Sequence, residues 1–442
     1  MKAGALRRFM LAGAIAAVAC AAPAQSKAAP GRLDPTFGDR GKVITAFGET
    51  VAGVADVARQ PDGKLVAAGS AHGGFALGRY LPDGSLDTGF GAGGTTVTTG
   101  FPGQDVARAG AVAIQPDGKV VAAGKVQQDS TGHTSFALAR YLPDGSLDRT
   151  FGMEGRVVTG RADARTLEAN ALAVAPDGKL IVAGTSYLDD VNGDDFVVAR
   201  YLPNGALDPT FGAAGMVFQD LEDSQDAAAA IVLRPDGTIV AVGRAVPKDQ
   251  ERAVRGLLVA YRPDGTLDER FADGGISAPG LGGLVNDATV DAAGRIVVAG
   301  TNIGWPGYEV RDFFVARFQP DGWLDRSFSH GRTSIDLGGS DLAEAVAVRP
   351  DGSILAAGSS DDPTNPDDAK KFVLVRFNPD GSVDRHFGRD GKVETVVGGK
   401  WSEAAALVVQ PDGKAVAAGS TGDSLSEECC SSFALARYDV GR

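Results

Sequence analysis

The richest group of potential metal ligands in the sequence is the acidic segment Asp189-Asp-Val-Asn-Gly-Asp-Asp195. Its oxygen-bearing side chains stand at alternating positions, as they do in calcium-binding loops. Gly193, however, does not stand where an EF-hand loop requires its glycine, and no glutamate follows that would bind the ion with both oxygens. We therefore expect a solvated acidic loop and no cofactor, with a calcium site that uses Asp190 and Asp194 as the alternative.

Aromatic side chains in loops are the next candidates, because an exposed ring offers binding area with little loss of conformational entropy. Trp305 and Tyr308 stand in the glycine- and proline-rich segment Asn302-Ile-Gly-Trp-Pro-Gly-Tyr308, and Trp401 stands in a loop between two repeat units. We predict that these residues contact a ligand or partner. The alternative is that each ring folds down and covers its own part of the fold.

Recognised catalytic motifs are absent from the sequence. It contains no Gly-x-Ser-x-Gly, His-Glu-x-x-His, P-loop or Cys-x-x-Cys motif. The four histidines are scattered, although His72 and His133 occupy equivalent loops of neighbouring repeat units and could face each other. We therefore assign no catalytic residue.

These candidates are set in a chain that repeats one unit seven times. The phrase Leu-Asp-x-x-Phe-Gly is intact in four copies and altered in three. The copies begin at Leu33, Leu86, Leu147, Leu207, Leu267, Leu324 and Val383. Between them lies a second phrase, Pro-Asp-Gly-Lys or a variant of it, which is followed by an apolar run. The glycine of this second phrase recurs at intervals of 55 to 61 residues. A fixed period of this length indicates units that share one continuous core.

Each unit contains four short apolar stretches separated by glycine- and proline-rich turns, which predicts four antiparallel strands. Strands such as Leu180-Ile-Val-Ala-Gly184 are apolar on consecutive residues, which indicates that both of their faces are covered. We therefore predict an all-β fold, a single seven-bladed β-propeller of four-stranded antiparallel blades. The last unit stops after its third strand, Phe433 to Tyr438, so we expect the N-terminal strand Gly41 to Phe47 to complete it and close the ring.

The aspartate of Leu-Asp-x-x-Phe-Gly is present in every unit, which favours a structural role over seven metal sites. It would accept N–H groups of its turn or pair with the arginine of the third strand, as with Asp148 and Arg140. One unit has Ala260 in place of this arginine but keeps Asp268. Asp268 must therefore find a different partner.

The phrases Arg140-Tyr-Leu-Pro-Asp-Gly-Ser-Leu-Asp148, Thr150-Phe-Gly152 and Gln115-Pro-Asp-Gly-Lys119 resemble the bacterial delta-60 repeat, a propeller-forming repeat distantly similar to the NHL repeat. The resemblance covers about residues 33 to 438. It implies an exported or surface propeller of unassigned activity, and it supplies no catalytic residues.

The sequence departs from this repeat at three places. Asp291-Ala-Ala-Gly294 replaces Pro-Asp-Gly, and the glycine after phenylalanine is lost at Phe271-Ala272 and Phe328-Ser329. We expect the units to be distorted there.

The N-terminus has the features of an export signal, because basic residues precede a small and apolar run that ends in the cleavage site Ala22-Pro-Ala24. We predict a signal peptide at residues 1–24, a short lead-in at 25–32 and the propeller at 33–442. The protein would then be exported, to the periplasm or the extracellular space. A twin-arginine signal and lipid attachment at Cys20 are the alternatives.

Composition limits the partners. The net charge of −13 at pH 7 would repel a phosphate backbone, so nucleic acid is not expected. No stretch beyond the signal approaches the roughly 20 apolar residues that span a bilayer. Cys429 and Cys430 are expected to be loop thiols, although an oxidising compartment would permit a bridge. We expect a monomer.

The loops between the second and third strands vary while the turns scarcely change, and the two sets should lie on opposite rims. The long loops are Val246 to Gly256, Thr301 to Asp312, Ser359 to Lys371 and Ser420 to Ser432. A rigid scaffold with one diversified rim favours binding. We therefore predict an exported, non-enzymatic scaffold whose loop-rich rim holds a protein, peptide or glycan.

The alternative is a propeller hydrolase, lactonase or lyase with an active site at the channel mouth. It would require three or more His, Asp or Glu side chains to converge at the channel, whereas a channel lined by Ala, Val and Gly favours the scaffold.

Overall fold

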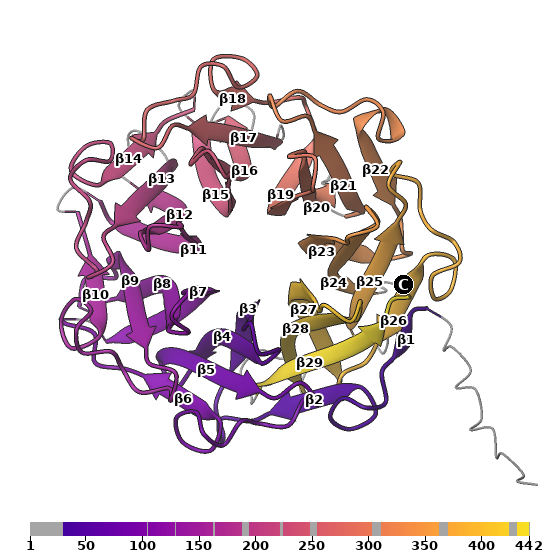
Figure 1. The fold of residues 1–442 in the computed structure, drawn as a ribbon, viewed down its shortest axis with the longest axis horizontal. Coiled ribbons are helices and arrows are strands. Elements are labelled where there is room, and N and C mark those ends of the chain that lie inside the picture. Colours follow the sequence, from indigo (N-terminus) through magenta and orange to yellow (C-terminus); the bar gives the residue numbers. More distant parts are fainter. Residues whose placement is uncertain are drawn as a thin grey trace, which may run out of the picture.

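The computed structural model describes residues 30–103, 105–128, 130–161, 164–187, 194–221, 224–247, 254–302, 311–361, 370–423 and 431–441. Over these ranges the chain forms seven antiparallel sheets arranged as blades around a common axis (Figure 1). The described helical structure is a 3₁₀ turn, η2 (Ser329–Gly331). No helix within these ranges is long and apolar enough to cross a bilayer. The predicted all-β, seven-bladed propeller is confirmed.

The first six blades each contain four strands in chain order, with the first strand nearest the axis (Figure 1). Blade 1 is β3 (Gly53–Arg59), β4 (Leu65–Ala71), β5 (Gly74–Tyr80) and β6 (Thr95–Thr98). Blade 2 is β7 (Val106–Ile114), β8 (Val120–Gln127), β9 (Thr134–Tyr141) and β10 (Arg156–Thr159). Blade 3 is β11 (Thr166–Val174), β12 (Leu180–Tyr187), β13 (Asp194–Tyr201) and β14 (Met216–Gln219). Blade 4 is β15 (Ser224–Leu233), β16 (Ile239–Pro247), β17 (Arg255–Tyr261) and β18 (Ile276–Ser277). Blade 5 is β19 (Gly283–Val290), β20 (Ile296–Asn302), β21 (Phe313–Phe318) and β22 (Arg332–Ile335). Blade 6 is β23 (Ser340–Val348), β24 (Ile354–Asp361), β25 (Lys371–Phe377) and β26 (Lys392–Thr395).

Blade 7 is built from both ends of the chain. Its strands are β27 (Trp401–Val409), β28 (Ala415–Gly422), β29 (Ser431–Asp439) and, from the N-terminus, β1 (Arg32–Leu33) and β2 (Lys42–Thr45). In β2, Thr45 lies opposite Phe433 of β29, so the predicted closure is confirmed. The short strand β1, which the sequence did not predict, pairs with the end of the same strand. As a result β29 is paired along both of its edges.

The core lies between the blades. All seven residues of β5 are buried, because a neighbouring blade covers each face. Leu77 of blade 1 and Val112 of blade 2, for example, belong to one apolar cluster. The Tyr141 hydroxyl also crosses this interface and donates to Thr98 Oγ1 at 2.8 Å. Burial raises the pKa of Tyr141, so the hydroxyl stays a donor. Equivalent bonds join Tyr80 to Thr45 and Tyr201 to Thr159.

The arginine of the third strand ties each turn to its own blade and to the next. Arg140 donates to Asp148 at 2.9 Å and to the carbonyl of Pro203 in blade 3. Its guanidinium lies 4.5 Å from the ring centroid of Phe151. Burial opposes ionisation of Asp148, but Thr150, Lys119 and Arg140 together lower its pKa. The predicted pairing is confirmed. It recurs as Arg79–Asp87, Arg200–Asp208, Arg317–Asp325, Arg376–Asp384 and Arg437–Asp34.

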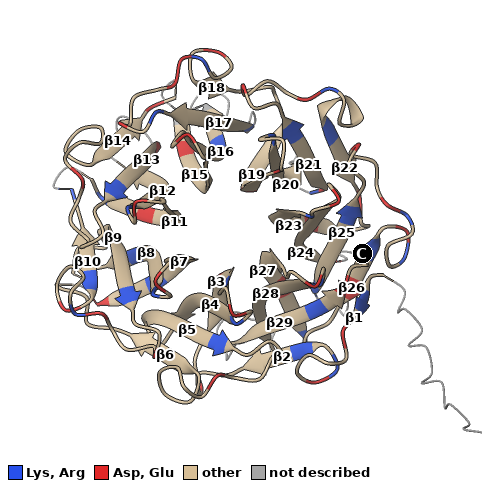
Figure 2. Cartoon of the chain, in the orientation of Figure 1, with Lys and Arg blue, Asp and Glu red and all other residues tan. Residues whose placement is uncertain are grey.

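Figure 2 shows these arginines as blue bands on β5, β9, β13, β21, β25 and β29, while β17 of blade 4 carries none at that place. There Asp268 accepts bonds of 2.8 and 3.0 Å from Arg270 instead. Arg234, from the hairpin turn of the same blade, places its guanidinium 5.6 Å from the Phe271 ring centroid. Asp268 therefore has the different partner that the sequence required.

The expected distortion is found at Phe328-Ser329 but not at Phe271-Ala272. Ala272 has a φ of 43° and Ser329 a φ of 41°, close to the 51° of Gly38 at the equivalent place. These residues take the left-handed conformation that glycine adopts more easily, because the turn's hydrogen bonds fix it. Gly294 likewise keeps a φ of 77°. At Phe328, however, the turn is one residue shorter, so Gly331 donates to the Phe328 carbonyl and the 3₁₀ turn η2 replaces the short bridge of the equivalent turns.

A circular permutation tests the closure. A chain that begins at Gly48 lacks β1 and β2, which exposes an edge of β29, so we expect a lower midpoint of urea unfolding and aggregation. A Cβ built on Gly441 would lie 3.3 Å from Pro30 Cβ, so Gly441 can be joined directly to Pro30. The permuted chain from Gly48 through this junction to Phe47 should recover the wild-type midpoint. Equal midpoints for the truncated and permuted chains would contradict the closure.

Arg140→Met should lower the free energy of unfolding by about 3 kcal/mol, because it leaves a buried carboxylate without its main cation. The control is Arg149→Met, since Arg149 pairs with Glu154 at 3.4 Å but both side chains are mostly exposed, at 81% and 64%. Its effect should stay below about 1 kcal/mol. Urea unfolding of both variants measures the difference, and similar values would refute a structural role for the buried pair.

Candidate functional site

The two rims of the propeller differ in how their charges are used. On the rim of the turns, Lys119 of a hairpin turn lies 3.1 Å from Asp148 of the neighbouring turn in the same blade. Lys64 and Asp87 repeat this contact in blade 1 at 3.2 Å. We call this the turn rim, and the opposite one, where second strands end and third strands begin, the loop rim. These charges of the turn rim therefore already have partners.

The residues predicted to bind a ligand fall in different places. Asp190, Trp305 and Tyr308 lie outside the described residues, as do Cys429 and Cys430. Trp401 does not stand in a loop between units, as the sequence suggested, but is the first residue of β27. A Cβ built on Gly422, its partner in β28, would meet the Trp401 Nε1 atom at 2.8 Å. The half-buried ring therefore covers its own blade, which is the alternative reading.

Asp194 is the predicted site residue that the structure places in a pocket. It begins β13 and is half-buried at the loop rim. It lines a hollow of about 350 Å³ that is bordered by blades 3, 4 and 5, together with Glu168 and Thr185 of blade 3 and Arg244 of blade 4. The sequence analysis missed Glu168 and Arg244. Calcium binding by the acidic segment stays a prediction.

The charges of the hollow are incompletely paired. Glu168 accepts from Lys125 Nζ of blade 2 at 2.7 Å. Burial raises the pKa of Asp194, with Arg244 opposing the shift and Glu168 adding to it. Within the described part of the chain, no ion pair within 4.0 Å or hydrogen bond joins Asp194 to Arg244. Both groups are therefore available to a ligand.

Asp194 and Arg244 each occupy a register position from which another blade makes an ion pair with the next blade. Lys370 occupies in blade 6 the position of Asp194, and it pairs with Glu403 of the next blade at 2.8 Å. The residue of blade 4 equivalent to Glu403 is Ala227, which leaves Asp194 facing a small side chain. Aligning the units in register would have revealed this difference between Ala227 and Glu403.

Arg244 lacks a carboxylate partner of the kind that Lys125 has, for a similar reason. It follows the strand glycine in β16 as Lys125 does in β8, and Lys125 pairs with Glu168 of the next blade. In blade 5 the position of Glu168 is taken by Leu284. Arg244 is consequently exposed beside the hollow.

Two asparagines complete the polar wall. Asn170 of β11 donates its side-chain N–H to the carbonyl of Ala228 at 2.9 Å, and Asn286 of β19 donates to that of Ala343 at 2.8 Å. Each bond crosses to the next blade and fixes the orientation of the amide. Both residues line the hollow. Their side-chain oxygens remain as acceptors, because each amide uses its nitrogen as the donor.

The central channel is lined mainly by alanines of the first strands. Each first strand carries a β-bulge in the same register, at Asn170 in blade 3 and at Glu344 in blade 6. Three carboxylates, Asp56, Asp287 and Glu344, interrupt the alanine wall around a cavity of about 180 Å³. Apart from these three carboxylates, the alanine-rich wall has the composition that we expect for a binding scaffold.

Asp287 and Asp56 have structural roles in the channel. Asp287 accepts the N–H of Ala288 at 2.8 Å and that of Val346 in blade 6 at 2.7 Å. Asp56 binds Val112 of blade 2 in the same way at 2.8 Å. Burial raises the pKa of Asp287 to about 7, and the nearby charges of Asp56 and Glu344 add to the shift, which its backbone bonds oppose. These carboxylates join neighbouring blades.

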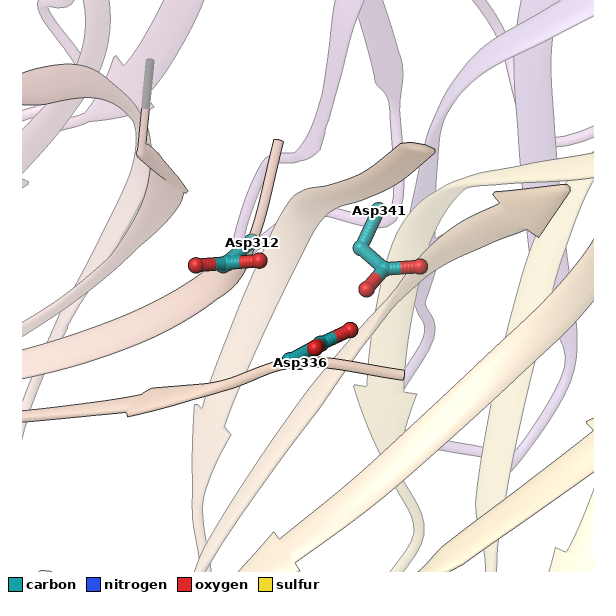
Figure 3. A group of neighbouring side chains, drawn as sticks. All are labelled: Asp312, Asp336 and Asp341. Atoms are coloured by element: carbon teal, nitrogen blue, oxygen red, sulfur yellow. The ribbon is translucent and has the colours of Figure 1, made fainter. Parts of the chain in front are cut away.

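Asp312, Asp336 and Asp341 form the one described group of three potential metal ligands whose atoms lie within 4.8 Å of one another (Figure 3). The group lies between blades 5 and 6, not among the channel-lining residues. It contains no histidine, so the suggested pairing of His72 and His133 finds no support in it.

Asp341 has a structural explanation that applies in other blades. It is buried and accepts the N–H of Leu337 in the interblade loop at 2.7 Å. Asp226 in blade 4 accepts from Leu221 at 2.8 Å at the same position. Burial raises the pKa of Asp341, and Asp336 and Asp312 add to the shift. We therefore assign Asp341 to the architecture of the interblade loops.

The described residues thus form a seven-bladed β-propeller with a polar hollow at its loop rim. Five segments of the chain match the family described as "Domain of unknown function (DUF5122) beta-propeller". They are residues 60–90, 115–151, 175–211, 294–328 and 349–387. The equivalent segment of blade 4, which carries Ala260, is not among them. This finding supports a β-propeller family, while the delta-60 name stays a prediction. No curated protein matches the chain.

Solved structures share the fold at low identity. A PL25 ulvan lyase, a polysaccharide lyase, has a TM-score of 0.51 and 11% identity, with 90% of this chain and 96% of that chain covered. A virginiamycin B lyase from Staphylococcus aureus has a TM-score of 0.48 and 10% identity, over 89% and 98% of the two chains. An α-L-arabinofuranosidase from Fusarium graminearum has a TM-score of 0.43 and 10% identity, over 74% and 92%. At these identities the likeness concerns the fold alone.

The pH dependence of stability tests the electrostatics of the channel. Burial raises the pKa of Glu344 to about 7, Glu403 adds to the shift and Lys370 opposes it. Because the folded protein then holds a proton that the unfolded chain has released, this contribution to stability is full below about pH 4.5 and is lost as pH rises to about 7.

Glu344→Gln should therefore match the wild type at low pH and exceed its free energy of unfolding by about 2 kcal/mol at pH 8. Urea unfolding across this range measures the difference. Glu154→Gln, at an exposed position, is the control and should follow the wild-type curve. A wild-type curve parallel to that of Glu344→Gln would disprove the burial of this charge.

Proposed function

We propose that this protein is an exported, non-enzymatic propeller that binds a partner at its loop rim, in the hollow bordered by blades 3, 4 and 5. The observation that carries the proposal is that Asp194 and Arg244 both border this hollow without the ion pairs that Lys370 and Lys125 make at the equivalent positions. An unpaired carboxylate and guanidinium at a concave surface are suited to recognising a polar ligand.

The chemistry of the hollow favours binding over catalysis. Cleavage of a glycosidic bond, for example, generally uses two carboxyl groups with separate roles. Here Glu168 is already paired with Lys125, which leaves Asp194 as the unpaired carboxylate among the described lining residues. The channel wall, in which alanine is the most frequent residue, offers no described group of three close ligands.

The partner would be a protein, a peptide or a glycan, met outside the cytoplasm by a monomeric chain whose residues 1–24 have been removed. The negative net charge supports a partner other than nucleic acid.

Capture experiments test the proposal. The mature chain is immobilised and exposed to envelope extract and culture medium, beside the double variant Asp194→Asn with Arg244→Gln. We expect the variant to retain at least about tenfold less partner, because two charge-assisted hydrogen bonds are lost.

The matched control is Lys370→Gln with Glu403→Gln, which removes one charge of each sign at the equivalent interface of blades 6 and 7. It should capture as much partner as the wild type. Equal capture by all three proteins would reject the hollow as the site. Conversion of the retained molecule into products would favour the hydrolase, lactonase or lyase.

A further inference from the structure

The hollow is close to electrically balanced. Its described wall contributes the carboxylates of Glu168 and Asp194 and the guanidinium of Arg244, and Lys125 lies against Glu168 at 2.7 Å. Two negative groups thus stand with two positive ones. A ligand with a net charge would meet a like charge wherever it meets an opposite one, and it would lose hydration on entry.

Hydrogen-bonding groups of both kinds converge on the hollow. Asp194 and the side-chain oxygens of Asn170 and Asn286 accept, since both amide nitrogens are engaged by backbone carbonyls. Arg244 donates, and the Thr185 hydroxyl can do either. A hydroxyl group is the ligand group that matches such a wall, because it donates to a carboxylate while it accepts from a guanidinium.

The size of the hollow is that of a small polar ligand or of one end of a longer one. Its volume of about 350 Å³ is at the lower end of the range for small-molecule sites. The three consecutive alanines Ala227 to Ala229 form one side, so a ring can approach the backbone of blade 4 closely.

We infer that the ligand of this hollow is a neutral glycan, whose neighbouring hydroxyl groups bridge the Asp194 carboxylate and the Arg244 guanidinium. This inference rests on the proposed function and specifies its ligand. Neighbouring hydroxyls on a sugar ring let one group donate to Asp194 while the other accepts from Arg244. The amide oxygens of Asn170 and Asn286 then take up further hydroxyls toward the channel.

An array of oligosaccharides tests the class of ligand. The mature chain is applied to neutral, uronic-acid-bearing and amino-sugar-bearing oligosaccharides and to a set of short peptides, and the strongest binder is measured by calorimetry. We expect neutral oligosaccharides to bind, with a Kd that changes less than about twofold between low and high salt, because the ligand carries no charge to be screened.

Asp194→Asn and Arg244→Gln should each weaken that binding about tenfold, the effect of one lost charge-assisted hydrogen bond. Glu403→Gln, in the register position of Glu168 at another interface, should leave it unchanged. Thermal unfolding of each variant separates loss of binding from loss of folding.

The outcomes separate the ligand class from the site. Binding confined to acidic sugars, amino sugars or peptides, and abolished by Asp194→Asn, would overturn the neutral glycan but keep the hollow as the site. If no glycan binds but partner capture still depends on Asp194 and Arg244, the neutral glycan is likewise overturned and the hollow is kept as the site. Neutral glycans that bind equally to wild type, Asp194→Asn and Arg244→Gln would overturn both this inference and the proposed site.

Discussion

The structure depends on one constraint, which is that no blade can cover its own two apolar faces. The third strands are buried on both sides, so every blade needs two neighbours, and a closed ring supplies them to all seven. The bond from Tyr141 to Thr98 and the reach of Arg140 to the Pro203 carbonyl cross the same interfaces. Pairing of β2 with β29 therefore supports every blade and not the last one alone.

Because the interfaces repeat, a residue at a given register position meets equivalent neighbours in each blade. This brings Lys370 to Glu403 and, in another blade, Lys125 to Glu168, because the two glutamates occupy the same position of the first strand. Ala227 and Leu284 occupy that position in blades 4 and 5 and offer no carboxylate. The proposed site therefore lies where these two interfaces lack the glutamate. In blades 2 and 6, Lys125 and Lys370 already join two blades.

The carboxylates divide into two groups by their electrostatics. Asp34 is one of the repeated turn aspartates. Burial opposes ionisation of its carboxyl group, yet Lys414, Thr36 and Arg437 lower its pKa to about 2. Asp194 and Glu344 lack such a set of donors, and burial raises the pKa of each. The first group is stabilised as part of the architecture. A raised pKa marks a carboxylate as a candidate for function. Asp287 also has a raised pKa, but its carboxylate accepts two backbone N–H groups and has a structural role.

The sequence by itself determined the number of blades, the ring closure and the pairing of six turn aspartates with the arginine of the third strand, because these are set by contacts within a repeat or by what the last repeat lacks. It also pointed to Asp194, as one of several acidic residues. Only the tertiary structure decided that Asp194 shares a hollow with Arg244, and that Trp401 lies on Gly422. Asp194 and Arg244 belong to different blades, so their proximity depends on how blades pack, which periodicity within a blade does not encode.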